Sequence, residues 1–174
     1  MNQTRRFLLF LGLCANFAQA ADVGIEGAGS PIGRGADVPD WVEQGASLPA
    51  FPIDANLIEF YVSAANTNRF YIDGATLSVG PDEVVRYALV IRASGGASNV
   101  TYEGIRCGAW TYRLYATGRS DGAWAWLRSG DWRPIANQHH VVLSRDFFCP
   151  LGTQIRSAEE GRDALRNGRH RLLP

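Results

Sequence analysis

Residues 84–92 read VVRYALVIR, a run of β-branched and aromatic side chains with the two-residue period of a β-strand. One face of this strand collects Val85, Tyr87, Leu89 and Ile91, and the other collects Val84, Arg86, Ala88, Val90 and Arg92. The first face is apolar throughout, so we expect it in the core. The second face carries charge, so we expect it to be partly solvated, as one face of an antiparallel sheet commonly is.

The segments on either side of this strand have a similar composition. The glycine-rich turn at residues 94–98 leads into residues 99–107, which predicts a hairpin with the strand at 84–92. Further strands are predicted where β-branched and aromatic residues gather between turn residues, at 57–62, 69–73, 76–79, 110–117 and 123–127.

The end of the chain has a different pattern. Ser157-Ala158-Glu159-Glu160 has the spacing of a capping box, in which a hydroxyl and a carboxylate bond the first free amides of a helix. Ala164 and Leu165 give this helix a modest apolar stripe, and Gly168 is a plausible stop. The whole pattern predicts an α+β, mainly β fold: a single antiparallel sheet meander, which could be strongly curved, with a short C-terminal helix.

The first residues have the three parts of a signal peptide, which we assign to residues 1–20. A short positive segment with Arg5 and Arg6 precedes an apolar run, and Ala18-Gln19-Ala20 ends it, so Ala21 is the expected mature N-terminus. The sequence leaves two export routes open, the general secretory route and the twin-arginine route. Lipid attachment at Cys14 is disfavoured, because the bulky Leu13 precedes it.

The rest of the chain divides at about residue 52. Residues 21–52 are rich in Gly and Pro and are expected to be an irregular arm that docks through Trp41. Residues 53–174 are expected to form a single globular domain. No later apolar run approaches the roughly 18 residues that cross a bilayer, so no transmembrane segment is expected in the mature protein.

The charge of the chain argues against a nucleic-acid partner. The 17 basic residues are balanced by 17 acidic ones, and removal of the signal peptide takes away two arginines, so no strongly basic protein results. Residues 21–59 are acidic and residues 145–174 are rich in Arg. Both ends are expected to be solvated; attraction between them, or recruitment of a partner, is the alternative.

Cleavage at residue 20 leaves two cysteines, Cys107 and Cys149. In an oxidising compartment they are expected to form a disulfide. A metal site is disfavoured because no CxxC or HxxxH spacing accompanies them, and no other spacing in the chain suggests a metal or a cofactor. A catalytic thiol is disfavoured because each cysteine has the other to pair with.

Two groups of residues are candidate sites. Glu103 and Arg106 would form a polar site if Gly104 makes a bulge, because ordinary alternation puts them on opposite faces; a structural ion pair near the disulfide is the competing interpretation. Trp124 and Trp126 share one face of a strand and could form an aromatic surface, although a place in the core is commoner for such residues.

Catalytic patterns are weak. No GxSxG elbow is present, and the histidines, His139 and His140 among them, are expected to be exposed loop residues. On an extended segment the two neighbours would point to opposite faces, so neither they nor Asp146 would build an acid–base site. Asp121, Asp131 and Glu103 are the acids near the tryptophans, and their spacing defines no paired site.

The segments Val85–Ile91 and Asn99–Cys107 resemble the CNP1-like family of exported, uncharacterised Gram-negative bacterial proteins. Phe70-x-Ile72-Asp73 and Ala164-Leu165-Arg166 are also similar, and the resemblance covers roughly residues 40–170. It implies export to the envelope and a domain of this size. It implies no activity, substrate or cofactor, so no functional residue is carried over.

The first functional hypothesis is therefore a periplasmic, non-enzymatic module, of unknown biochemical function, that binds an envelope protein or polysaccharide or supports the envelope. The alternative is a carboxylate-dependent enzyme of the cell-wall hydrolase type. A deep pocket with convergent titratable groups would favour the enzyme, and an aromatic or charged surface patch would favour the binding module.

Overall fold

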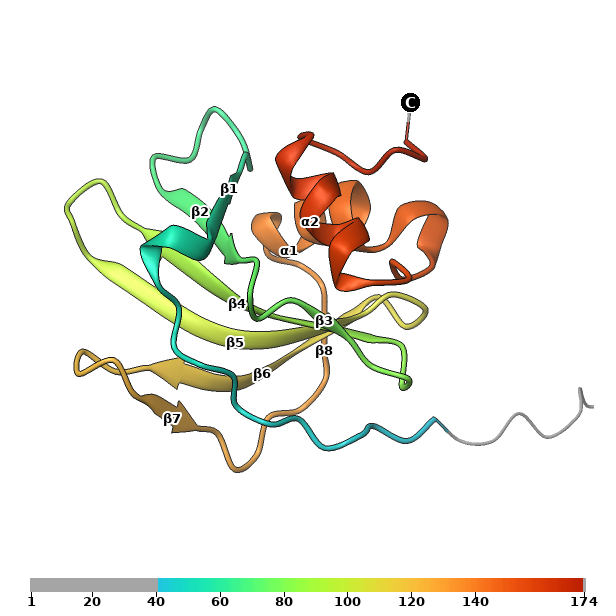
Figure 1. Ribbon diagram of the computed structural model, residues 1–174, viewed down its shortest axis with the longest axis horizontal. Helices are drawn as coiled ribbons and strands as arrows, with labels where there is room; N and C mark the ends of the chain where they lie inside the picture. The colour runs from blue at the N-terminus through green and yellow to red at the C-terminus, as the bar shows by residue number, and fades with distance from the viewer. Residues whose placement is uncertain (1–40, 174) are drawn as a thin grey trace, which may run out of the picture. The chain divides into compact units, whose positions relative to one another are not determined.

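The computed structural model describes residues 41–173; the predicted signal peptide and most of the predicted arm lie outside them. Eight strands form one open, antiparallel sheet (Figure 1). They are β1 (Leu57–Phe60), β2 (Arg69–Asp73), β3 (Ser78–Val79), β4 (Val84–Arg92), β5 (Ser98–Arg106), β6 (Thr111–Gly118), β7 (Trp124–Trp126) and β8 (Arg133–Pro134). The expected fold class is thus confirmed.

The strand order places β1 at one edge of the sheet. Neighbouring strands follow the order β1-β2-β4-β5-β6-β7, while β3 pairs with β4 and β8 with β6. β4 and β5 form the predicted hairpin and pair along their whole length, from Val84 opposite Arg106 to Arg92 opposite Ser98. The long hairpin is therefore the centre of the sheet, as the composition of residues 84–92 predicts.

Helices cover one face of the sheet (Figure 1). They are α1 (Gln138–Val142), which continues as a π-helical turn (Leu143–Phe148), and α2 (Ala158–Arg166); short 3-10 turns lie at Asp54–Asn56 and Pro150–Gly152. The predicted inward face of β4 packs against these helices, and Tyr87 contacts Phe148 with ring centroids 5.3 Å apart. The main hydrophobic core lies between the sheet and this helical layer.

The predicted helix cap is confirmed with one change. Ser157 Oγ accepts the Glu160 N–H at 3.2 Å, as a capping box requires. The Glu160 carboxylate reaches back to the N–H of Arg156, not to that of Ser157. Gly168 has a φ of 78°, a conformation that favours glycine and ends the helical path.

The second face of β4 is mostly covered, which corrects the sequence-based expectation except at its end, where the Arg92 side chain is 40% exposed. Val84, Arg86, Ala88 and Val90 are all buried. Residues 41–51 have no regular secondary structure but lie against this face, where Trp41 Nε1–H donates to Asp82 O at 2.8 Å. Trp124 Nε1–H likewise donates to Pro49 O. We call residues 41–51 the strap; its contacts shield the second face from water.

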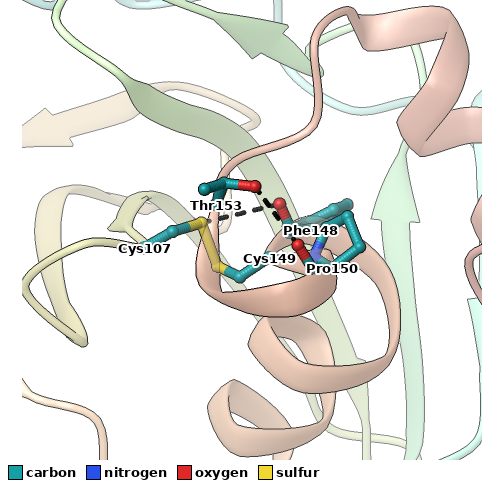
Figure 2. The surroundings of a disulfide bond; sticks show 5 residues. All are labelled: Cys107, Phe148, Cys149, Pro150 and Thr153. Carbon is teal, nitrogen blue, oxygen red and sulfur yellow. Dashed lines mark hydrogen bonds between the residues drawn. A yellow bond between two sulfur atoms is a disulfide. The ribbon is translucent and has the colours of Figure 1, made fainter. Parts of the chain in front are cut away.

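The predicted disulfide is present. Cys107 and Cys149 are bridged with their Cα atoms 5.4 Å apart, within the range that disulfides require. Cys107 follows β5 and Cys149 follows the π-helical turn, so the bridge joins the sheet to the helical layer (Figure 2). No helix within residues 41–173 has the length and apolarity needed to cross a bilayer.

Candidate functional site

The structure does not bring Glu103 and Arg106 together. Gly104 pairs regularly with Arg86 on β4 and Arg113 on β6, so it makes no bulge; the irregularity in the β5–β6 register lies between Tyr102 and Glu103. Glu103 points into the main core. Arg106 lies on the second face, where its guanidinium stands 3.9 Å from the ring centroid of Trp41. Each residue therefore has a separate role.

Glu103 is the centre of a buried polar network. Its carboxylate accepts hydrogen bonds from His140 Nε2 at 2.8 Å, from the Thr101 hydroxyl at 2.8 Å and from the Tyr87 hydroxyl at 3.2 Å. Burial raises the pKa of Glu103, but the bonds from His140 and Thr101 outweigh burial, so the pKa lies below its usual value. The carboxylate is thus held ionised by its donors.

The expectation of exposed loop histidines is wrong. Residues 138–148 are helical rather than extended, so His139 and His140 lie near each other, with ring centroids 4.1 Å apart. His140 is buried under Tyr112, and the ring of His139 stacks on Phe70. The buried positions 140, 143, 144 and 147 have the spacing of a helix face, a signal present in the sequence.

This network is closed to substrates. The side chains of Glu103 and His140 are only 6% and 2% exposed. His140 Nδ1 and Ser144 Oγ are buried and have no partner among the described residues. The Asp146 carboxylate accepts from Arg145 and from no histidine side chain; His170 bonds Asp146 only through the backbone, its N–H donating to Asp146 O at 2.8 Å. The arrangement fits a role in fixing the core, since a reacting molecule could not reach the carboxylate.

The two candidate tryptophans differ in exposure. Trp124 is half-buried; its ring contacts Phe51 of the strap and Tyr102, at centroid distances of 5.0 and 6.1 Å. Trp126 is 45% exposed and lies parallel to the ring of Tyr115, 6.4 Å away. Trp124 therefore holds the strap, and Trp126 alone of the pair contributes to an accessible aromatic surface.

Glu43 fastens the strap and was not found by sequence reasoning. Its carboxylate forms an ion pair with Arg113. It also accepts hydrogen bonds from the Tyr115 hydroxyl at 2.6 Å and from Trp132 Nε1–H at 3.1 Å. Arg86 lies 3.6 Å away. Burial and the bond to Glu43 raise the pKa of Tyr115. These partners lie roughly 40 to 90 positions along the chain, so no local pattern could indicate them.

The edge strand β1 offers unused hydrogen-bonding groups. Gly74 N–H donates to Asn56 O, so Asn56, and by alternation Ile58 and Phe60, direct their backbone groups toward β2. The backbone groups between them point away from the sheet. These outward groups are Leu57 C=O, both the N–H and the C=O of Glu59, and Tyr61 N–H. Since β1 ends the strand order, no further strand of the described chain pairs with these groups.

Two hollows lie along β1, and because Glu59 lines both of them they are continuous along the strand. One, of about 490 Å³, is lined by residues 59–63 on the strand side, and the other, of about 590 Å³, by residues 55–59. Arg166 of α2 lines both. Tyr61, which directly follows β1 and lines the first hollow, is 71% exposed. We call this surface, between β1 and α2, the β1 groove.

Comparison with known proteins identifies one relationship. The model of the CNP1-like family matches residues 36–166, well over half of the chain. No curated protein and no solved structure matches the chain significantly. The comparisons therefore give a family and no named activity.

Proposed function

The chain belongs to the CNP1-like family, and we propose that it is an exported, periplasmic, non-enzymatic module that binds an extended segment of an envelope protein in the β1 groove. The partner segment adds a strand to the sheet beside β1. This is an established mode of peptide recognition, in which backbone hydrogen bonds supply affinity and side-chain pockets supply selectivity.

The observation that carries the proposal is the coincidence of an unpaired strand edge with a groove. Native proteins usually cover, twist or charge a free edge, because it invites pairing with another chain. Here Leu57, Glu59 and Tyr61, whose outward backbone groups pair with no strand of residues 41–173, line the two hollows.

The enzyme alternative has less support. Its three candidate acids do not converge: Glu103 is buried in the core, Asp121 lies in an exposed turn paired with Arg119, and Asp131 is exposed. A carboxylate pair for glycoside hydrolysis needs two accessible groups about 5 to 10 Å apart across a substrate. The β1 groove therefore gives the better account.

Export is supported by the three-part pattern of residues 1–20 and by the disulfide, a bond that persists in oxidising compartments. Osmotic-shock fractionation of expressing cells, followed by N-terminal sequencing, tests it. We expect soluble protein that begins at or next to Ala21. Protein that stays in the cytoplasm with residues 1–20 attached would refute the export proposal.

Binding is tested by selection of peptides from a random heptapeptide phage library with the purified protein, followed by affinity measurement. Glu59→Pro removes an outward N–H and keeps the hydrogen bonds of Ile58 and Phe60 to β2. Proline is tolerated at position 59 because this N–H lies on the free edge of the sheet. Glu59→Ala is the matched control, since both variants lose the ion pair with Arg69. We expect Glu59→Pro alone to abolish binding; equal binding by both variants overturns the proposal.

A further inference from the structure

We propose that the segment bound in the β1 groove carries an acidic side chain, whose carboxylate pairs with Arg166. The inference rests on the proposed function, because it assigns a chemical class to the ligand of the same groove. It names Arg166 as the residue that selects among extended segments.

The helix α2 places two arginines along the groove. Arg162 and Arg166 are four residues apart and so lie on one face of the helix. Arg162 is already engaged: it donates to Gly74 O at 3.2 Å and pairs with Glu159 at 2.5 Å. Arg162 therefore ties α2 to the sheet and leaves Arg166 as the next cation along the helix.

Arg166 keeps its hydrogen-bonding capacity. It forms loose ion pairs with Asp163 and Glu159, whose carboxylates stand 3.7 and 4.0 Å from its Nη1 atom, beyond hydrogen-bond distance. Its side chain is 55% exposed. Arg166 thus lines the groove with donors that a carboxylate can accept two at a time.

The acids that line the groove are committed to other cations. Glu59 receives two hydrogen bonds from Arg69, at 2.9 and 2.5 Å. Asp146 receives two from Arg145, at 2.9 and 3.3 Å. Both carboxylates already accept two hydrogen bonds from an arginine of the chain, so they attract a cation of the ligand only weakly. Arg166 donates no hydrogen bond to Asp163 or Glu159, so it can donate to an anion of the ligand. Charge complementarity therefore favours an acidic segment over a basic one.

The spacing of a strand fits this pairing. In an added strand, alternate side chains point to the same side, so one side of the bound segment faces α2. An Asp or Glu on that side can reach the guanidinium from either hollow, because Arg166 lines both. An exposed pair of this kind contributes a modest preference, about three- to fivefold in affinity.

The experiment repeats the heptapeptide selection with three baits: the wild-type protein, Arg166→Gln and Arg156→Gln. Arg156 is the matched control, since it is 91% exposed, lies 3.6 Å from Glu160 and lines neither hollow. We expect wild-type protein and Arg156→Gln to enrich Asp and Glu above the input library, and Arg166→Gln to lose this enrichment. Acidic peptides should bind Arg166→Gln about three- to fivefold more weakly.

The outcomes separate the two proposals. In one outcome, the selected peptides bind Glu59→Ala but not Glu59→Pro and are not enriched in Asp or Glu. This result overturns the role of Arg166 and leaves the β1 groove as the binding site. Equal losses in Arg156→Gln and Arg166→Gln also overturn it, because they indicate general attraction to a positive surface. Peptides that bind Glu59→Pro as well as Glu59→Ala overturn the proposed function itself.

Discussion

His140 Nε2 donates a hydrogen bond across 2.8 Å to the Glu103 carboxylate, and both side chains are buried between β5 and α1. The bond joins the centre of the sheet to a helix of only five residues. A helix this short is unstable on its own. The pair therefore holds the helical layer in place on the sheet.

Replacement of Glu103 by Ala should be strongly destabilising. His140, Thr101 and Tyr87 would all lose their acceptor, and removal of one partner from a buried charged network costs about 3 to 5 kcal/mol. Urea unfolding followed by circular dichroism measures this loss. Thr101→Val, which removes one donor, should cost less; equal stability of Glu103→Ala and wild type would contradict a structural role.

The stability of the fold should fall in mild acid because of His139. Burial, and next the charge of His140, lower the pKa of His139 from 6.5 to about 4. Between these pH values the unfolded chain takes up a proton that the folded chain does not, so stability decreases as the pH falls from 6.5 to 4. His139→Phe keeps a ring against Phe70 and should flatten this part of the curve; an unchanged slope would refute the assignment.

Gly104 should be intolerant of a side chain because of crowding. A Cβ there would stand 2.8 Å from the Tyr115 hydroxyl and 2.8 Å from Val84 Cγ1. Its φ is not positive, so backbone strain is not the cause. Gly104→Ala should cost about 1 to 3 kcal/mol by overpacking. Gly108→Ala, where a Cβ meets nothing within 4 Å, is the control; equal unfolding midpoints for the two would contradict this account.

The disulfide should contribute substantially to stability. Cys107 and Cys149 are 42 positions apart, and a loop of that length gives about 4 kcal/mol in the chain-entropy model. The double variant Cys107→Ala, Cys149→Ala should unfold at lower urea than the oxidised protein and at about the same urea as the reduced one. Mass spectrometry that finds two free thiols in protein purified without a reductant would contradict the bridge.

Much of the sheet could be predicted from the sequence because side-chain alternation is a local signal. The predicted hairpin at residues 84–92 and 99–107 corresponds to β4 and β5 almost residue for residue. The disulfide was predictable because only two cysteines remain after residue 20. The cap at Ser157 was predictable because its two partners lie three residues apart.

The helix at residues 138–148 was missed for physical reasons. It begins without a side-chain cap at Asn137 and contains the β-branched pair Val141-Val142, so local preferences do not favour it. Packing of its histidines on Phe70 and Tyr112 stabilises it instead. The strap is irregular and contacts the sheet through Trp41, in line with the arm expected there. The bonds of Glu43 to distant residues have no periodic pattern in the sequence, so they could not be predicted.

The β1 groove could not be predicted because its walls are distant in sequence. β1 and α2 are about 100 residues apart, and the groove exists only because the strand order leaves β1 at the edge. Arg166 has no unusual local context in the sequence. What distinguishes it is its position beside both hollows, which depends on the complete fold.

The most direct test of strand addition is amide hydrogen exchange of β1, measured by NMR with and without a selected peptide. The N–H groups of Glu59 and Tyr61 point outward, so we expect the peptide to slow their exchange strongly. The N–H groups of Ile58 and Phe60 already face β2 and should change little. Protection of Glu59 and Tyr61 alone would support the account; binding that leaves both amides exchanging at their free rates would contradict it.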